Sequence, residues 1–236
     1  MLIAGKSTMN SLCDRGKFYA AKSYAAKIYV AKFYLGLTLL ILALPLQYAS
    51  GSELQSLQNF TQSAQFRDNP QQFALLIRHA LAPGTGDPAE FTLDDCSTQR
   101  NLDETGRQQA GKIGRLLRQS GLDRLSIFSS QWCRCRETAK LLAEGWKENV
   151  PAPKVTDLPI INSFFQAFEK REKQTGDLQQ WLLERSQSRQ QDSLAVLVTH
   201  QVNITALTHV YPSSGEVVIM HINDGAIEVV GTLDTL

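Results

Sequence analysis

Short apolar runs alternate with amphipathic stretches from residue 73 onward, and this alternation restricts the possible folds more than any other feature of the chain. The apolar runs have the length of buried strands, and they read FALLIRH (73–79), LSIFSS (125–130), LPII (158–161) and LAVLVT (194–199). Amphipathic helices are predicted over 103–119, from Trp132 to a stop at Gly145, over 177–187 and over 202–209. The final run, GEVVIMHINDGAIEVVG, predicts two strands joined at Asn223-Asp224-Gly225. We therefore predict an α/β fold, with a mainly parallel sheet flanked by helices in three layers.

The first 51 residues differ from this pattern. Lysine recurs every five residues from Lys17 to Lys32, an uncharged apolar run covers residues 35–46, and the small residues of YASGS follow at 48–52. A basic segment, a short apolar core and small residues are the ingredients of a secretory signal peptide. A membrane span needs about 20 residues, so this shorter run favours cleavage near residues 49–51 over a permanent anchor.

The predicted domain organisation follows from this boundary. Residues 1–51 are a signal peptide or an N-terminal signal anchor, 52–72 are a linker or a helix leading into the domain, and 73–236 form the main domain. A basic low-complexity leader, or a true start at Met9, also accounts for the repeat. We expect an exported protein, periplasmic or secreted, that contacts a membrane only if the N-terminal segment remains uncleaved.

The charge balance argues against a nucleic-acid partner. The whole chain has 24 basic and 23 acidic residues, and residues 1–51 hold six of the basic and one of the acidic ones. The remainder has 18 basic against 22 acidic residues, so it lacks the excess of Lys and Arg that a phosphate backbone attracts.

Arginine and histidine residues come at the ends of three predicted strands. Arg78 and His79 end the first, His200 follows LAVLVT, and Arg134 lies in the first turn of the helix after LSIFSS. Each of them alone has an ordinary structural explanation, as a solvated loop residue or a capped histidine. Ligands of α/β sheets bind beyond the carboxyl ends of the strands, so we expect the four to converge. Two guanidinium and two imidazole groups repel one another unless an anion joins them, and a phosphoryl group fits this environment.

Five motifs in succession resemble those of the histidine phosphatase superfamily, which includes phosphoglycerate mutases and acid phosphatases. They read LIRHA, RNLDETGRQQA, SSQWCRCRETA, VLVTHQVNITAL and SGEVVIM, and together they span about residues 76–220. The resemblance implies a phosphoglycerate mutase-like fold and is strongest to small exported phosphatases. It also implies that His79 is phosphorylated in turnover, that Arg78 and Arg134 bind the phosphoryl oxygens, and that His200 completes the pocket.

These roles predict a phosphomonoester hydrolase that uses a phosphohistidine intermediate and needs neither a metal ion nor a cofactor. Its partner is a small phosphorylated substrate. A catalytically weak phosphate-ligand binding protein of the same fold is the alternative, and a phosphomutase is a poorer one, because a mutase needs a closed site and a proton donor.

The proton donor is the one departure from the family pattern. Many relatives place a Glu between the second Arg and the second His, or an Asp directly after the second His. This chain instead reads LPIINSFFQAF (158–168) and His200-Gln201. The loop carboxylates that could substitute are Asp94, Asp95, Glu169 and Glu172.

Three cysteines remain after the leader and its Cys13 are removed. Cys133 and Cys135 are two positions apart on a predicted helix, so they lack the C-x-x-C spacing of a zinc site. A disulfide is the stronger prediction for an oxidising compartment. We expect Cys96 to pair with Cys133, with Cys135 as the alternative. The remaining histidines, His209 and His221, are expected to be structural or surface residues.

Overall fold

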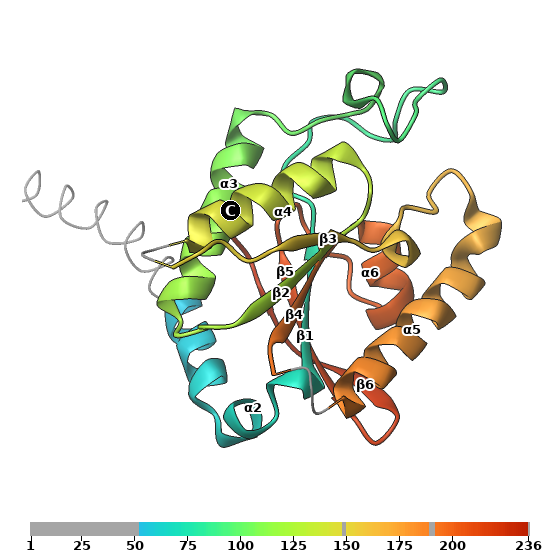
Figure 1. The fold of residues 1–236 in the computed structure, drawn as a ribbon. Coiled ribbons are helices and arrows are strands. Elements are labelled where there is room, and N and C mark those ends of the chain that lie inside the picture. The colour runs from blue at the N-terminus through green and yellow to red at the C-terminus, as the bar shows by residue number, and fades with distance from the viewer. Residues whose placement is uncertain (1–51, 148–149, 189–191, 236) are drawn as a thin grey trace, which may run out of the picture. The chain divides into compact units, whose positions relative to one another are not determined.

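The computed structural model describes residues 52–147, 150–188 and 192–235, so the predicted leader lies outside the described residues. Its single sheet has the strand order β3-β2-β4-β1-β5-β6 (Figure 1). The strands are β1 (Phe73–Arg78), β2 (Leu125–Ser129), β3 (Val155–Asp157), β4 (Leu194–Thr199), β5 (Val217–Asn223) and β6 (Ala226–Leu233). The first four run parallel, whereas β5 is antiparallel to β1 and β6 is antiparallel to β5. The predicted α/β class with a mainly parallel sheet is confirmed.

Helices cover both faces of this sheet. Residues 52–62 are helical, and the further α-helices are α2 (Ala64–Asp68), α3 (Glu104–Gln119), α4 (Cys133–Trp146), α5 (Arg171–Gln187) and α6 (Gln201–Thr208). The apolar faces of residues 52–62, α3 and α4 pack in one hydrophobic cluster, and those of α5 and α6 pack in another. The sheet and the helices packed on its two faces form the three layers that the sequence predicts. None of the helices in the described part of the chain is long and apolar enough to cross a membrane.

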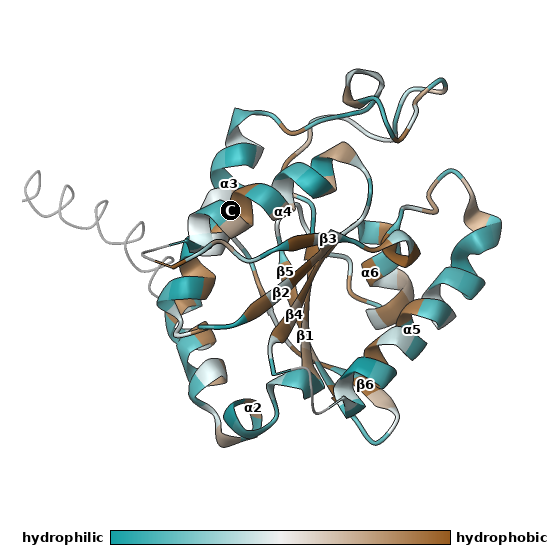
Figure 2. Ribbon diagram, viewed as in Figure 1, coloured by the Kyte–Doolittle hydropathy of each residue, from teal (hydrophilic) through white to brown (hydrophobic). Residues whose placement is uncertain are grey.

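Strand β1 shows why the central strands are apolar throughout. Leu75 and Ile77 face the α3 and α4 side, whereas Ala74 and Leu76 face the α5 and α6 side. Successive side chains of a strand point to opposite faces, so a strand covered on both faces must be continuously apolar. The apolar colour of the central strands in Figure 2 reflects this double burial.

The last two strands form the predicted hairpin. Asp224 and Gly225 make the two-residue connection, with φ angles of 47° and 85°. Positive φ at both central residues is the geometry of a type I′ turn, which suits the twist of a hairpin and favours Asp-Gly.

Three element predictions differ from the structure. The LPII run is not a strand, because β3 ends at Asp157 and Pro159–Ile161 forms a 3-10 turn, η3. Proline lacks the N–H that a strand ladder needs, and the Ile161 carbonyl instead accepts a hydrogen bond from Thr199 Oγ1 at 2.7 Å. Helix α5 also begins earlier than predicted, at Arg171.

Gly145 does not end its helix, which continues through Trp146. A Cβ atom at Gly145 would collide with the carbonyl oxygen of Gly111, and one at Gly114 would collide with that of Leu142. The glycines therefore allow α3 and α4 to approach closely, and this contact, rather than helix termination, explains Gly145.

Candidate active site

His79 lies directly after β1, and its side chain is buried. Its ring nitrogen Nδ1 lies 2.8 Å from the carbonyl oxygen of Ala80, which can only accept a hydrogen bond. Nδ1 therefore carries the proton, and Nε2 keeps its lone pair. Burial, followed by the positive charge of Arg134, lowers the pKa of His79 to about 3. His79 is thus a neutral imidazole with an available nucleophilic nitrogen.

The backbone after His79 is fixed by two helices. The N–H of Ala80 donates to Thr138 Oγ1 on α4 at 3.0 Å, and the N–H of Leu81 donates to Gln109 Oε1 on α3 at 3.0 Å. The other end of the Gln109 amide donates to the Ser214 carbonyl at 2.7 Å. Gly215 follows with φ of 75°, and a Cβ there would collide with Gln109. The SGEVVIM motif therefore supplies Gly215, and the absence of a side chain there lets the loop before β5 pack against Gln109. Gln109 in turn holds the backbone that follows His79.

His200 is the N-cap residue of α6, and its ring centroid lies 5.6 Å from that of His79. Nδ1 is 3.4 Å from Nη2 of Arg134, which can only donate, so Nδ1 is the acceptor. Nε2 then carries the proton and donates to Ser130 Oγ at 2.9 Å. Burial, followed by the charge on any protonated His79, lowers the pKa of His200 well below its usual value. Both histidines are therefore neutral at pH 7.

Three arginines line the same cavity as the two histidines. They are Arg78 at the end of β1, Arg134 in the first turn of α4, and Arg100 in the loop before α3. Arg78 donates from Nη1 to the Pro212 carbonyl at 2.9 Å. The Nε atoms of Arg78 and Arg134 are buried and make no hydrogen bond to any of the described residues. Such orphaned donors in a cationic pocket are suited to an anionic ligand.

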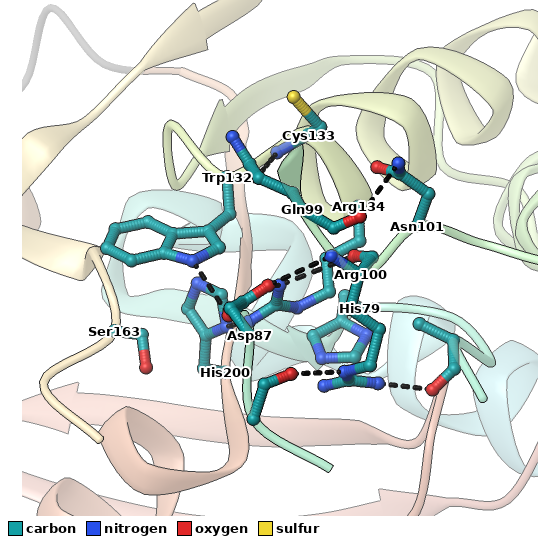
Figure 3. A network of polar contacts seen from close by, with 12 residues as sticks. His79, Asp87, Gln99, Arg100, Asn101, Trp132, Cys133, Arg134, Ser163 and His200 are labelled. Carbon is teal, nitrogen blue, oxygen red and sulfur yellow. Dashed lines mark hydrogen bonds and ion pairs between the residues drawn. The ribbon is translucent and has the colours of Figure 1, made fainter. Parts of the chain in front are cut away.

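Asp87 is the only carboxylate among the described residues that line this cavity. Its Oδ1 accepts from Arg134 Nη1 at 2.7 Å and from the Arg100 N–H at 3.1 Å, and its Oδ2 accepts from Trp132 Nε1 at 3.2 Å (Figure 3). Burial would raise the pKa of Asp87, but the hydrogen bond and charge of Arg134 outweigh it and hold the pKa below its usual value. With three guanidinium groups, the amine of Lys170, one carboxylate and neutral histidines, the pocket carries a net positive charge.

The structure thus brings together all four residues that the sequence singled out, and it adds Arg100 and Asp87. The cavity has a volume of about 400 Å³ and opens at the carboxyl ends of β1 and β4. Arg100 begins the RNLDETG motif, so its place in a motif was visible, but no role was assigned to it. Nothing in the GTGDP stretch indicates that Asp87 turns back toward Arg134.

A family model described as "Histidine phosphatase superfamily (branch 1)" matches residues 74–176. This segment runs from β1 through the Arg100 loop, α3, β2, α4 and β3 to the start of α5, and it therefore holds the site residues named above except His200. Residues 74–176 belong to the histidine phosphatase superfamily.

Solved structures of histidine phosphatases and related proteins share the fold. The product of the open reading frame Rv3214 from Mycobacterium tuberculosis is 17% identical, with a TM-score of 0.50, over 70% of this chain and 98% of that one. A candidate α-ribazole-5′-P phosphatase from Escherichia coli K-12 is 15% identical, with a TM-score of 0.50, over 70% and 97%. The protein histidine phosphatase SixA complexed with tungstate is 13% identical, with a TM-score of 0.48, over 69% and 97%. No curated protein sequence matches the chain.

The four carboxylates considered as the missing proton donor do not line the cavity. Asp94, Asp95, Glu169 and Glu172 are all exposed. Asp95 is engaged in the loop itself, where its Oδ1 accepts from the N–H and the hydroxyl of Ser97. Among the described residues, the carboxylate that does line the cavity is Asp87, which Arg134 holds ionised.

The predicted disulfide between Cys96 and Cys133 is confirmed. It joins the loop that contains Arg100 to Cys133, the first residue of α4. Arg134 is the next residue of this helix. Cys135 is a buried free thiol whose Sγ lies 3.4 Å from His200 Nε2, and burial raises the pKa of this thiol to about 12. Among the described residues, no group of three or more His, Cys, Asp or Glu side chains could hold a metal ion.

Proposed function

We propose that this protein is a phosphomonoester hydrolase that acts on a small phosphorylated substrate through a phosphohistidine intermediate on His79. The observation that carries the proposal is the state of His79, a neutral imidazole whose Nδ1 proton is held by the Ala80 carbonyl and whose ring borders a pocket of three guanidinium groups. The membership of residues 74–176 in the histidine phosphatase superfamily supports the proposal.

The first half of the reaction transfers the phosphoryl group to the enzyme. Nε2 of His79 uses its lone pair to form the P–N bond, while the P–O bond to the leaving group breaks and its electron pair stays on that oxygen. Guanidinium groups of Arg78, Arg100 and Arg134 supply positive charge to the phosphoryl oxygens, where a preorganised donor is most effective. In this mechanism the guanidinium groups take the role that a metal ion has in other phosphoryl-transfer enzymes.

The second half of the reaction returns the enzyme to its starting state. A water molecule attacks phosphorus, the P–N bond breaks, and the electron pair returns to Nε2 of His79 while inorganic phosphate leaves. The Nδ1–H bond to the Ala80 carbonyl holds the ring in one orientation through both halves. A dianionic phosphoryl group beside His200 favours protonation of its Nδ1, which then becomes a further donor.

The second candidate function is that of a phosphate-ligand binding protein with weak or no turnover. The observation that favours it is the state of Asp87, which is ionised and committed to Arg134 and so does not supply a proton to a leaving group. General-acid catalysis contributes typically 10²- to 10⁴-fold, so its loss would slow the hydrolysis of alkyl esters most. A phosphomutase would share this difficulty.

The phosphoenzyme test separates these candidates. His79→Ala is expected to abolish both phosphate release from a panel of phosphomonoesters and the acid-labile, base-stable phosphate that labels the wild-type protein. His209→Asn, an exposed histidine outside the cavity, is the matched control and should behave like wild type. Turnover of His79→Ala near the wild-type rate would refute the mechanism, whereas a wild type that binds vanadate but releases no phosphate would favour the binding protein.

The protein is also proposed to act after export, in the periplasm or outside the cell. The leader features of residues 1–51 motivate this, although they lie outside the described residues. The Cys96–Cys133 disulfide supports it, because disulfides persist mainly in oxidising compartments.

A further inference from the structure

The outer part of the active-site cavity is aromatic. Phe91, Trp132 and Phe165 line it, and Phe165 is 61% exposed, whereas His79, Arg134 and His200 at the inner end are buried. If the phosphoryl group occupies the inner end, as the proposed function requires, then these rings surround the rest of the substrate. The chemistry of the rings therefore indicates the class of leaving group.

Phe165 lies where two loops meet across the cavity. A Cβ atom placed on Gly86 would be 4.0 Å from Cε1 of Phe165, so the ring lies beside the loop that precedes Asp87. In the same region, Nε2 of Gln166 donates to the Asp87 carbonyl at 3.3 Å. The segment 163–167 thus reaches the GTGDP loop, and Phe165 lines the cavity with 61% of its surface exposed.

A second aromatic wall is held rigidly. Nε1 of Trp132 donates to Asp87 Oδ2 at 3.2 Å, and the Trp132 ring lies edge-on to His200 at 5.3 Å between centroids. Phe91 packs on the same indole at 5.6 Å. These contacts fix the ring, so Trp132 presents a preformed apolar surface next to the catalytic candidates.

Two polar side chains next to Phe165 are engaged within the protein, although Thr85, Lys170 and Gln201 also line the cavity. The amide of Gln166 bonds to the Asp87 carbonyl, and the Ser163 hydroxyl accepts from the Phe165 N–H at 3.2 Å. A sugar phosphate needs several hydrogen-bond partners around its hydroxyls, because burying them unpaired is costly. A flat apolar group needs none, and it gains from covering Phe165 and Trp132.

We propose that the substrate is an aryl or arylalkyl phosphomonoester, whose apolar leaving group occupies the cavity between Phe165 and the Trp132–Phe91 wall. This inference rests on the proposed phosphatase function and specifies its substrate class. It differs from a simple preference for good leaving groups, because it predicts that ring size matters when leaving-group acidity does not change.

The kinetic test compares 2-naphthyl phosphate with phenyl phosphate, whose leaving groups have almost equal acidity. Wild-type kcat/KM is expected to be about tenfold higher for the naphthyl ester, the discrimination that a small addition of apolar volume typically gives in a hydrophobic pocket. Phe165→Ala should bring the ratio close to one. Phe168→Ala is the matched control, because Phe168 has 60% of its surface exposed, lies three residues away and does not line the cavity.

A binding measurement separates a failure of this inference from a failure of the proposed function. Calorimetry with 1-naphthylmethylphosphonate and methylphosphonate, neither of which can be hydrolysed, should give tighter binding of the naphthyl compound to wild type and to Phe168→Ala, but not to Phe165→Ala. If phenyl phosphate is hydrolysed and the naphthyl-to-phenyl ratio is one, the inference is wrong and the phosphatase stands. If no ester is hydrolysed, the phosphatase proposal fails, and equal binding of the two phosphonates would overturn the inference as well.

Discussion

Asp87 and Arg134 form an ion pair inside the pocket, where their side chains are only 6% and 4% exposed. The carboxylate also accepts hydrogen bonds from Trp132 and from the Arg100 backbone, so one side chain connects three parts of the site. A buried pair of this kind contributes little net stability, because desolvation offsets the attraction, but removing one partner is costly. Asp87 therefore acts as a positioning residue for Arg134 and as a limit on the positive charge of the pocket.

Asp87→Asn should separate these two effects. The amide can accept hydrogen bonds but cannot neutralise Arg134, so the free energy of unfolding should fall by about 3 kcal/mol. Phosphate should nevertheless inhibit the variant more strongly, because the pocket has lost its one negative charge, while kcat falls because Arg134 is less firmly held. Urea unfolding and the inhibition constant of inorganic phosphate measure the two effects.

Asp157→Asn provides the control for this variant. Asp157 pairs with Arg136 at the surface, where both side chains are about 40% exposed, and exposed pairs contribute less than about 1 kcal/mol. Its stability and phosphate inhibition should remain near wild type. An Asp87→Asn protein that binds phosphate as weakly as wild type, or more weakly, would show that the anion site lies away from Asp87.

Sequence reasoning located the site residues that follow regular elements and missed those that depend on loop paths. His79 and His200 follow strands, and Arg134 begins a helix after one, so the rule for strand ends in α/β sheets placed them. Asp87 and Arg100 lie in the irregular stretch between β1 and α3, whose course is set by contacts such as the Arg100 Nε hydrogen bond to the Gly86 carbonyl at 2.8 Å. No periodic pattern encodes such a course.

At the scale of elements, the predictions succeeded where hydrophobic periodicity and local turn chemistry agree. The Asp224-Gly225 hairpin and helix α3, capped by the Asp103 side chain on the Gly106 N–H, are examples. They failed where a tertiary contact decides the outcome. Gly145 has the residue type of a helix end, but the close approach of α3 to α4 explains it, and that contact cannot be read from α4 alone.

The loop between β1 and α3 is connected to α4 by the Cys96–Cys133 disulfide, with 37 residues of separation. Gln99 adds a second link, because its Oε1 accepts from the Cys133 N–H at 2.9 Å. Replacing both cysteines with serine is expected to lower the free energy of unfolding by up to about 4 kcal/mol, since closing a loop of this length restricts the unfolded chain. Denaturant unfolding with and without reductant measures this loss.

Cys135→Ala is the control for the disulfide, because it leaves the pair intact. Reductant should lower its stability as it lowers that of wild type, whereas the stability of the double serine variant should not respond to reductant. Non-reducing peptide mapping of the protein taken from the periplasm or medium tests the proposed location at the same time. Recovery of Cys96 and Cys133 as free thiols from exported protein would contradict the disulfide. Failure to find the protein in either exported fraction would contradict the location.

At the scale of the whole molecule, the two buried histidines of the site make the free energy of unfolding depend on pH. His79 and His200 are buried without a carboxylate partner, beside three arginines, and both have lowered pKa values. The unfolded chain takes up a proton on each histidine at its ordinary pKa of about 6.5, but the folded protein does not. Stability is therefore highest above this pKa and falls as the pH drops, for His79 over the range from about 6.5 to about 3.

For His79 alone, linkage gives a loss of about 2 kcal/mol of unfolding free energy between pH 8 and pH 5, and His200 changes stability in the same direction. This window lies above the range in which Asp87, whose pKa is lowered, takes up its proton, so the histidines can be observed separately from it. His79→Gln is expected to remove about 2 kcal/mol of the pH dependence, whatever its stability at pH 8, whereas the exposed-site variant His209→Asn should keep the wild-type slope. Urea unfolding curves at pH 8, 6.5 and 5 measure the three slopes. If His79→Gln and wild type lose the same free energy between pH 8 and pH 5, then His79 is not held as a neutral imidazole, and it would lack the free lone pair that the proposed nucleophilic attack requires.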